Sequence, residues 1–320
     1  MKPLMIVAIV FGVIASLILL LLIVSTINHS IQLNKEKAAF PPPGEMIEVG
    51  DKSLHVYSEG EGEITLVFLA GHGTSSPTLD FKPLWMRMKD EYRIAVVEKS
   101  GYGWSKVSDS PRDIQTILEE TRRSLEGAGE KPPYVLLPHS MSGLEAIYWA
   151  QKYPDEVKAI IGLDPSVPET TEVLSEPSNV QLSLLHFISK IGLTRFMPEA
   201  ELIKNLPLMD SDDLSEGEKL VYKAMFFRST LTKDMLREVE FLKENSRIVG
   251  KGQIPQNTPM YFFISQQQGQ TVKGWKDVLL LYLSRIDKKD FTILDTGHYI
   301  HHEEAELIAR ELKTFLSEID

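Results

Sequence analysis

Short, continuous runs of apolar residues recur along this chain from about residue 45 onward. Runs of this kind predict buried strands in a sheet whose two faces are both covered. Two shorter segments come before them, on either side of a Gly50-Asp51 turn, and predict two short strands. The predicted strands cover residues 47–49, 54–57, 64–70, 92–97, 134–137, 157–163, 260–265 and 291–294.

Apolar residues at helical spacing lie between most of these predicted strands. The segment Ser110-Pro111-Arg112-Asp113 predicts a helix start, with the serine as N-cap and the proline at the first helical position. Further helices are predicted over residues 141–153, 275–286 and 303–316. Strands that alternate with helices imply right-handed crossovers, so we expect an α/β fold with a mostly parallel central sheet flanked by helices.

Residues 166–255 interrupt this alternation. They contain amphipathic helical patterns over residues 182–191, 218–227 and 232–242. The segment is too long to be a simple connection between two strands. A helical insertion in an α/β sheet usually covers the active site, so we expect a cap over residues 166–255. The core is then formed by residues 45–165 and 256–320, and the polar tract of residues 266–270 is expected to be a surface loop.

The N-terminal segment has a different pattern. Residues 4–24 contain no charged side chain, and about 21 residues of helix span roughly 30 Å of hydrocarbon. A cleaved signal peptide is the alternative, but its apolar core is only about 7–15 residues long and ends in a small-residue cleavage site. We therefore predict a transmembrane anchor over residues 1–27. A linker follows over residues 28–44, in which Pro41-Pro42-Pro43 favours an extended spacer.

Charged residues on the two sides of the apolar segment barely distinguish its orientation. Lys2 stands before it, while Lys35 and Lys37 follow it, so the positive-inside rule is nearly balanced. A short N-terminal tail before a long domain usually stays inside. We therefore expect a single-pass protein of the cell membrane with its large domain outside the cytoplasm.

Composition narrows the classes of function. The 320 residues include 34 Lys and Arg against 45 Asp and Glu, which gives a net charge of −11. A nucleic-acid-binding surface needs clustered positive charge, and this balance disfavours such a partner. Cysteine is absent, which removes thiolate catalysis, disulfides and cysteine metal sites together.

The most informative segment is residues 134–143, which read YVLLPHSMSG. An apolar strand runs into a serine flanked by small residues, and a helix begins at once. A serine at such a turn is lifted above the sheet, and the helix N-terminus presents backbone N–H groups to developing negative charge. Ser140 is therefore a candidate nucleophile. The alternative is that this serine merely caps the helix.

Three other segments follow predicted strands and support this interpretation. Residues 70–74 (AGHGT) form a glycine-rich turn that can aim a backbone N–H at the oxygen of a tetrahedral intermediate. Residues 98–105 (EKSGYGWS) form a tight loop, and its Tyr102 and Trp104 are candidates to line a pocket. Residues 296–303 (TGHYIHHE) place His298 after the last strand, where it can reach a serine at the carboxyl edge of the sheet.

Together these motifs resemble α/β-hydrolase-fold serine hydrolases, and in particular bacterial membrane-anchored α/β hydrolases of unassigned substrate. The segment PHSMSG resembles the family motif GHSMGG, with Pro138 and Ser142 in place of glycine, and implies that Ser140 is the nucleophile. EKSGYGWS resembles the D-x-R-G-x-G-x-S loop, with Glu98 where the family has aspartate. GHYIHHE resembles the loop that carries the family's general base, which implies His298.

The resemblance fails at the acid. The family usually places a carboxylate after the strand that follows the cap, but residues 262–270 read FFISQQQGQ. Asp164 ends the apolar strand before the cap, where some α/β hydrolases carry their acid, and it would share a sheet edge with the histidine loop. Asp164 is therefore the preferred partner of His298. Asp295 and a site with no acid are the alternatives.

The oxyanion hole is expected to consist of backbone N–H groups, of which Met141, next to the nucleophile, supplies one. The second is His72 if residues 70–71 replace the family's His-Gly pair, and Thr74 if residues 72–73 do. The end of the strand near residue 70 favours His72.

The other histidines are given lesser roles. His139 is grouped with the pocket candidates, although packing explains it better than chemistry. His301 and His302 are expected to face solvent or the base of the cap. A metal site of His298, His301, His302 and Glu303 is disfavoured because the spacing differs from H-E-x-x-H, so we expect no metal and no cofactor.

These inferences predict acyl transfer to water, in which His298 takes the proton of Ser140 and the serine attacks an ester carbonyl. Anchoring beside a membrane favours a lipophilic carboxylic ester as the small-molecule substrate. One alternative is a proline-iminopeptidase-like aminopeptidase, which would need a cap carboxylate such as Glu216, Glu218 or Glu240 to bind a free amine. Another is a non-hydrolytic ligand sensor or partner-binding protein that keeps the fold.

Overall fold

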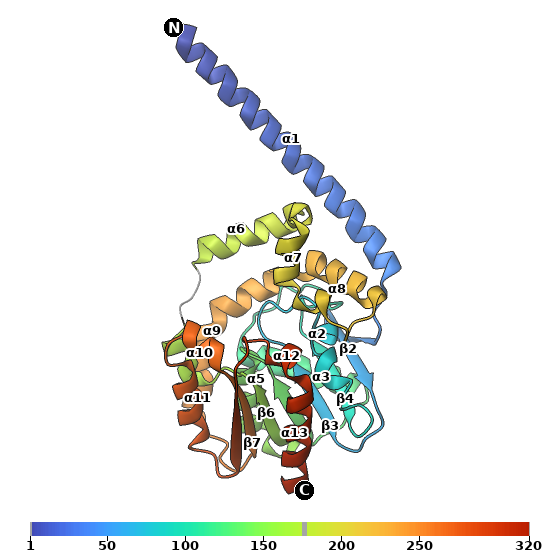
Figure 1. Ribbon diagram of the computed structural model, residues 1–320, viewed down its shortest axis with the longest axis vertical. Coiled ribbons are helices and arrows are strands. Elements are labelled where there is room, and N and C mark those ends of the chain that lie inside the picture. Colours follow the sequence, from blue (N-terminus) through green and yellow to red (C-terminus); the bar gives the residue numbers. More distant parts are fainter. Residues whose placement is uncertain (1, 175–177, 320) are drawn as a thin grey trace.

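The computed structural model describes residues 2–174 and 178–319. An eight-stranded sheet lies at the centre of the globular part, in the order β1-β2-β4-β3-β5-β6-β7-β8 (Figure 1). β2 runs antiparallel to both of its neighbours, and the other neighbouring strands are parallel. The mostly parallel sheet flanked by helices is therefore confirmed. The strands are β1 (Glu45–Val49), β2 (Lys52–Glu59), β3 (Thr65–Leu69), β4 (Arg93–Glu98), β5 (Tyr134–Pro138), β6 (Val157–Leu163), β7 (Met260–Ser265) and β8 (Lys289–Leu294).

Helices cover both faces of this sheet. They are α2 (Pro77–Asp80), α3 (Lys82–Trp85), α4 (Ile114–Gly127), α5 (Ser142–Lys152), α10 (Gln266–Thr271), α11 (Trp275–Leu283), α12 (Ile300–Glu303) and α13 (Ala305–Ile319), with a short 3₁₀ helix, η1 (Pro154–Glu156). Side chains alternate along a strand, so in β3 Val67 and Leu69 enter the core with α4, α5 and α11, while Leu66 and Phe68 enter the core with α3 and α13. Two buried faces require apolar residues at every position, which explains the continuous apolar runs.

Two of the predicted local structures differ from the observed ones. α4 begins at Ile114 and not near Ser110: the Asp113 carboxylate caps it by accepting a hydrogen bond from Thr116 N at 3.0 Å. Arg112, which precedes the N-cap residue Asp113, is fully buried and pairs with Glu120 at 2.6 Å. This pairing keeps the preceding chain out of the helix. The polar tract expected to be a loop forms the short helix α10, capped by the Ser265 hydroxyl.

The insertion between β6 and β7, called the cap below, consists almost entirely of helices. They are η2 (Pro168–Glu172), α6 (Asn179–Lys190), η3 (Leu193–Phe196), α7 (Glu199–Asn205), η4 (Pro207–Asp210), α8 (Glu216–Ser229) and α9 (Lys233–Lys251). α7, η4 and α8 share a small hydrophobic core that includes Leu202, Tyr222 and Phe226. In Figure 1 the cap helices α6, α7 and α8 lie above the sheet, between it and the N-terminal helix.

The N-terminal helix α1 (Lys2–Ala39) is 38 residues long and projects from the globular part (Figure 1). This helix is long and apolar enough to cross a membrane. Its most apolar stretch is not buried in the described structure. The linker differs from expectation because residues 28–39 continue the helix. These residues contain no glycine or proline, and the helix ends only before Pro41, which disfavours helical geometry in the residue that precedes it.

Candidate active site

Ser140, Asp164 and His298 lie at one edge of the sheet because each follows the carboxyl end of a parallel strand. Ser140 comes after β5, Asp164 directly after β6, and His298 in the loop after β8. β5, β6, β7 and β8 are consecutive neighbours in the sheet. The sheet order thus brings together three residues that are far apart in the sequence.

The turn at Ser140 is sharp. Ser140 has a φ of 52°, in the left-handed region that side-chain-bearing residues rarely adopt. Close approaches on both sides fix this turn. A Cβ at Gly143 would lie 2.2 Å from Ser166 O, and a Cβ at Gly71 would lie 2.8 Å from Ser140 Cβ. Both positions therefore require glycine, and the turn holds the serine against the loop that follows β3.

Pro138 and Ser142, where the sequence departs from the family's glycines, fit this turn without opening it. Pro138 is the last residue of β5 and is paired with Leu69 of β3. The Ser142 hydroxyl lies 2.6 Å from Leu69 O and 2.8 Å from His139 O, so it ties the start of α5 to the ends of two strands. Ser142 thus replaces a glycine with a side chain whose hydroxyl is hydrogen-bonded.

His298 bridges the serine and the aspartate. Its Nδ1 lies 2.6 Å from Asp164 Oδ2, and its Nε2 lies 2.8 Å from Ser140 Oγ. A buried carboxylate favours the tautomer in which Nδ1 carries the proton, which leaves Nε2 to accept the serine hydroxyl. The side chain of His298 is 22% exposed, whereas that of Asp164 is fully buried.

The other oxygen of Asp164 has partners that the sequence did not reveal. Asp164 Oδ1 accepts hydrogen bonds from Ser265 N at 3.0 Å and from Trp275 Nε1 at 2.9 Å. These two donors hold the carboxylate in place and compensate for its burial. Ser265 stands at the end of β7, the place where the family usually carries its acid, and supplies a backbone donor there instead.

The alternatives for the acid lie elsewhere. Asp295 is exposed, and its backbone carbonyl accepts a hydrogen bond from Gln267 Nε2 at 3.2 Å. The side chain of Gln267 therefore points along the surface of the β8 loop. Among the described residues, the only carboxylate within hydrogen-bond distance of His298 is Asp164.

The two backbone N–H groups expected to form the oxyanion hole belong to segments next to Ser140. Met141 is the N-cap of α5, and the first N–H groups of a helix have no partner within the helix. Gly71 packs directly against Ser140 Cβ, which places the chain that leads into His72 beside the serine side chain. This contact favours His72 over Thr74 as the second backbone donor.

The loop after β4 is held by Glu98, the residue that replaces the family's aspartate. The buried Glu98 carboxylate accepts hydrogen bonds from Trp104 N at 2.7 Å and from Thr78 Oγ1 at 2.9 Å, and lies 3.0 Å from His55 Nδ1. A Cβ at Gly103 would lie 2.0 Å from this carboxylate. Glu98 therefore organises the loop.

The two aromatic residues of this loop are packed in different places. Tyr102 is fully buried, and its hydroxyl donates a hydrogen bond to Glu238 Oε2 at 2.5 Å. Trp104 is also buried, and its Nε1 donates a hydrogen bond at 3.1 Å to the carbonyl of Phe40, a residue of the linker. Tyr102 thus links the core to the cap, and Trp104 links the core to the linker.

Glu238 of α9 is the cap carboxylate that meets the core. It lies 3.2 Å from Lys99 Nζ and 3.8 Å from Arg112 Nε, and it is almost completely buried. Burial alone would raise the pKa of Glu238, but the charges of Lys99 and Arg112 lower it, so the carboxylate stays ionised. The sequence does contain a signal for this residue, because Glu238 falls on the buried face of α9 with Met235 and Leu242.

The three cap carboxylates considered for an aminopeptidase are placed differently. Glu216 is largely exposed and pairs with Lys219 at 3.0 Å. Glu218 contacts Lys82 at 2.5 Å, which satisfies its charge. Glu240 is exposed. In the part of the chain that the structure describes, none of the three carboxylates pairs with a group at Ser140.

Asp80, His301 and His302 form a second cluster of ionisable groups. Asp80 Oδ2 lies 3.2 Å from His301 Nε2, and Asp80 Oδ1 lies 3.1 Å from His302 Nε2. Of the two places expected for these histidines, solvent or the base of the cap, solvent does not apply to His301, which is fully buried. Its partner Asp80 also contacts the hydroxyl of Tyr222, a cap residue, at 3.3 Å. A carboxylate from α2, far away in the sequence, makes this burial possible because it accepts hydrogen bonds from both rings.

This cluster is the group of described residues that could hold a metal ion, because its three ligand atoms lie within 4.8 Å of one another. Here the same atoms already pair with each other. Burial alone would raise the pKa of Asp80, but the charge of His302 and the hydrogen bonds from both histidines lower it. Burial also lowers the pKa of His301 to about 4, so this ring is neutral near neutral pH.

His139 lies between this cluster and His298. Its ring centre is 4.7 Å from that of His298 and 4.9 Å from that of His301, and it donates from Nε2 to the His298 carbonyl at 3.1 Å. Burial, together with the neighbouring histidines, holds the pKa of His139 well below its ordinary value. This neutral ring therefore supports the loop that carries His298.

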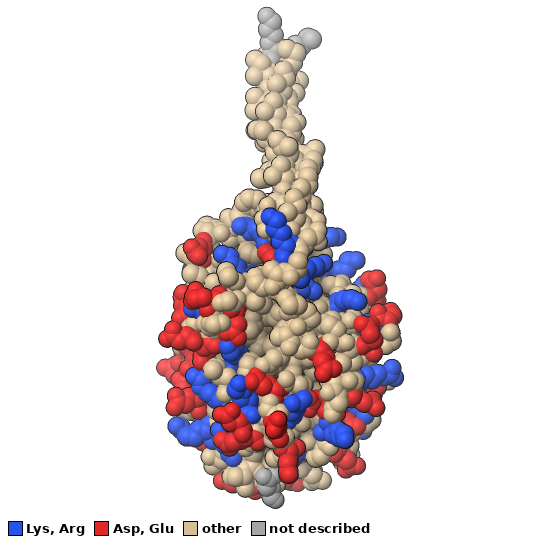
Figure 2. Space-filling view, turned by 90° about the vertical axis from the view of Figure 1, so that its right-hand side faces the viewer, with Lys and Arg blue, Asp and Glu red and all other residues tan. Residues whose placement is uncertain are grey.

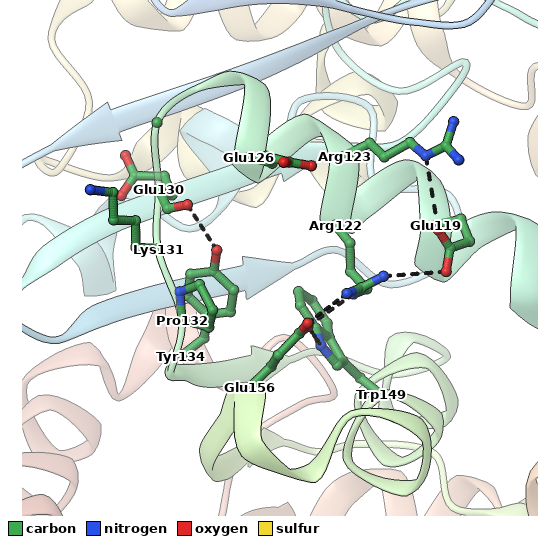
Figure 3. Close-up of a pocket in the computed structure, with 11 residues that line it drawn as sticks. Glu119, Arg122, Arg123, Glu126, Glu130, Lys131, Pro132, Tyr134, Trp149 and Glu156 are labelled. Carbon is green, nitrogen blue, oxygen red and sulfur yellow. Dashed lines mark hydrogen bonds and ion pairs between the residues drawn. The ribbon is translucent and has the colours of Figure 1, made fainter.

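A cavity of about 500 Å³ lies at the opposite end of β5 (Figure 3). Tyr134, the first residue of β5, lines it together with Trp149 and charged residues of α4. Arg122 reaches Glu156 at 2.5 Å and Glu119 at 3.3 Å, so these charges are already paired (Figure 3). Because Ser140 follows the carboxyl end of β5, this cavity is separate from the serine.

Comparisons with known proteins agree with this architecture. The model of a family described as alpha/beta hydrolase fold matches residues 67–186. The uncharacterized protein YbdG of Bacillus subtilis is 41% identical over 254 residues, which cover 79% of this chain and 78% of YbdG. The 2-(acetamidomethylene)succinate hydrolase of Mesorhizobium japonicum is 27% identical over 135 residues, which cover 40% of this chain and 45% of that protein.

Solved structures share the fold at low sequence identity. The epoxide hydrolase of Bacillus megaterium superimposes with a TM-score of 0.62 and 19% identity, over 85% of this chain and 100% of that chain. The enol-lactonase of Burkholderia xenovorans gives a TM-score of 0.57 and 14% identity, over the same shares of the two chains. At these identities the likeness concerns the fold.

Proposed function

Because the chain belongs to the α/β-hydrolase family, we propose that it is a serine hydrolase that cleaves a carboxylic ester through an acyl-enzyme. The observation that carries this proposal is the position of His298, whose two ring nitrogens contact Ser140 Oγ and Asp164 Oδ2 at 2.8 and 2.6 Å. This is the geometry that a nucleophile, a general base and an orienting acid need.

In the proposed reaction, Ser140 Oγ attacks the ester carbonyl carbon while His298 Nε2 accepts the hydroxyl proton. The backbone N–H groups of Met141 and His72 stabilise the negative charge on the carbonyl oxygen. The imidazolium, stabilised by Asp164, then donates its proton to the departing alcohol. A water molecule activated by His298 attacks the acyl-enzyme, and the carboxylic acid is released.

Asp164, which directly follows β6, suits this reaction because its hydrogen-bond partners keep its carboxylate in place. Ser265 N and Trp275 Nε1 occupy Oδ1, so only Oδ2 is left for the imidazole. An orienting carboxylate held by two further donors selects one tautomer of His298. This replaces the carboxylate that the family usually carries after β7.

Neither alternative function gains support from a specific contact. An aminopeptidase would bind a free amine with a cap carboxylate, but Glu238, the cap carboxylate that meets the core, is already paired with Lys99 and Arg112. A non-hydrolytic sensor would not need a hydroxyl that is hydrogen-bonded to an imidazole. Turnover therefore distinguishes the sensor from the enzyme.

A fluorophosphonate probe tests the reactive serine in the full chain. We expect the probe to label the wild type and the control Ser284→Ala, which removes an exposed hydroxyl at the C-terminal end of α11, but not Ser140→Ala. A series of carboxylic esters with increasing acyl length then tests turnover. Labelling of Ser140 without hydrolysis of any ester would favour the sensor, and labelling of Ser140→Ala would contradict the assignment of the nucleophile.

We also propose that α1 anchors the protein in the cell membrane with the hydrolase domain outside. Residues 4–24 are uncharged and exposed, and the part of α1 that follows them is bound to the cap. Arg195 pairs with both carboxylate oxygens of Glu36 at 2.7 Å and donates to His29 Nδ1 at 2.9 Å. Full-length protein should therefore sediment with membranes and resist extraction at high salt, whereas a mature N-terminus near His29 would indicate a cleaved signal peptide.

A further inference from the structure

The helix α6 packs against the rest of the cap by one face only. Leu182 is buried there, His186 Nδ1 donates to the Leu231 carbonyl at 2.6 Å, and Ser189 Oγ donates to the Thr230 carbonyl at 3.1 Å. Residues 182, 186 and 189 recur at helical spacing, so they define the inward face of α6.

The opposite face of α6 is apolar and exposed. Val180, Leu184 and Phe187 recur at the same spacing, half a turn away from the inward face, and are 78%, 56% and 48% exposed. Phe196 of η3 is 57% exposed and follows the end of this helix. A helix that faces water carries polar residues on its outer side, so this set of four residues, the outer face below, calls for an apolar environment.

The contact between α6 and α1 fixes the level of the outer face. Ser25 Oγ donates a hydrogen bond to the carbonyl of Ile191, the C-cap residue of α6, at 2.7 Å. A Cβ at Gly192 would lie 2.3 Å from His29 Cβ, so the two segments touch. Ser25 directly follows the uncharged residues 4–24. The outer face therefore starts where a bilayer spanned by α1 would end, and Figure 1 shows α1 rising above α6.

Positive charge gathers at the same level. Lys190, Arg228 and Lys233 line a cavity of about 260 Å³ together with His29 and Leu33 of α1. Figure 2 shows Lys and Arg around the base of the apolar helix, in a chain whose net charge is −11. Lysine and arginine beside a membrane are attracted to anionic headgroups.

We propose that the outer face of α6 and η3 inserts into the headgroup region of the bilayer that α1 spans, so that the cap rests on the membrane. Interfacial amphipathic helices bury their apolar face by about 5–10 Å in this region. The proposal rests on the membrane anchor proposed above. It identifies the occupant of the outer face as lipid because the helix beside that face is itself the anchor.

Depth measurements on the full chain test this proposal. The sequence contains no cysteine, so Phe187→Cys introduces a single site for a fluorescent label. The matched control is Leu281→Cys in α11, an apolar residue that is 60% exposed on the core. A third label at Phe11→Cys reports whether α1 itself inserts. Each protein is reconstituted into vesicles of phosphatidylcholine and phosphatidylglycerol, with quenchers attached to the lipid near the headgroup or, separately, with iodide in the water.

We expect the lipid-attached quencher to quench the label at position 187 but not the label at position 281, and iodide to do the reverse. Quenching of both labels by iodide alone, while the label at position 11 remains in lipid, would overturn the proposal and leave the anchor intact. A label at position 187 that neither quencher reaches would mean that protein, such as a second copy of the chain, covers this face, and this would also overturn it. Loss of lipid quenching at position 11 would contradict the anchor itself.

Discussion

The pairs Asp164–His298 and Asp80–His301 use the same chemical groups in different surroundings. In the first pair, a backbone N–H and an indole hold one carboxylate oxygen, and the other oxygen contacts one histidine. In the second, each carboxylate oxygen of Asp80 contacts a different histidine. The hydroxyl of Tyr222 lies 3.3 Å from Asp80 Oδ1. Both carboxylates are buried, so burial alone does not separate the two pairs.

The second nitrogen of the histidine is what separates them. His298 Nε2 contacts the hydroxyl of Ser140, and the His298 side chain is 22% exposed. His301 is fully buried, and its Nδ1 has no hydrogen-bond partner among the described residues. The comparison indicates that a histidine–carboxylate pair can act in the proposed reaction only when its second nitrogen contacts a hydroxyl and is accessible to solvent. Without these two features, we expect the same pair to stabilise the fold.

The largest expected effect is that of Ser140→Ala, which removes the hydroxyl from the first pair. We expect hydrolysis of esters to fall on the order of 10³-fold or more, because in the proposed mechanism Ser140 forms the acyl-enzyme. The fold should persist because Ser140 stands at an edge, and far-ultraviolet circular dichroism checks this. Near-wild-type hydrolysis by this variant would break the comparison, because the first pair would then need no nucleophile.

Asp164→Asn should have the next largest effect. The amide lacks the charge that stabilises the imidazolium and favours the other tautomer of His298, so kcat should fall roughly 10²–10⁴-fold. Asp295→Asn is the matched control, because Asp295 is exposed and its side chain does not contact His298. Equal losses in the two variants would show that Asp164 has no special role.

The positions of these three residues could be expected from the sequence because each follows an apolar run that marks the end of a strand. The partners of the carboxylates could not. Trp275 was predicted only as a helix start, and nothing in its spacing shows that its indole reaches Asp164. The sequence leaves open whether His301 faces solvent or the cap base, because the residue that makes its burial tolerable, Asp80, lies in another segment.

The linker shows the opposite kind of error. Pro41-Pro42-Pro43 favours an extended spacer, but proline acts mainly on itself and on the residue before it, so it does not extend the whole of residues 28–44. Residues 28–39 contain neither glycine nor proline, and His29 and Glu36 bind Arg195 of the cap from the helical conformation. Applied to each residue separately, these rules predict a helix that continues to residue 39.

Asp80→Asn probes the second pair. We expect the free energy of unfolding to fall by about 1–3 kcal/mol, because buried hydrogen-bond partners of the two histidines are lost. Activity per folded molecule should change far less than in Asp164→Asn. Chemical denaturation in detergent and kcat on the same preparation measure both quantities. A loss of kcat as large as that of Asp164→Asn, without loss of stability, would place Asp80 in the chemistry.

A change of pH should act on the second pair in a defined direction. The pKa of His301 is lowered to about 4 from an ordinary value of 6.5, so the unfolded chain binds a proton more readily than the folded one between these values. Stability is therefore complete above about pH 6.5 and falls as the pH drops toward 4. The midpoint of denaturation should decrease over this window less steeply in His301→Gln than in the wild type. Identical slopes would contradict the buried, neutral histidine.

The smallest expected effect is that of Gln267→Ala, at the place where the family usually carries its acid. The side chain of Gln267 is exposed and donates to the Asp295 carbonyl at 3.2 Å, so it does not reach His298. The backbone of Ser265, two residues earlier, makes the contact with Asp164, and an alanine at position 267 leaves that contact unchanged. Esterase kinetics should therefore give kcat and KM values close to those of the wild type. A large fall in kcat would mean that a glutamine orients the imidazole, and Asp164 would then join Asp80 as a carboxylate that stabilises the fold.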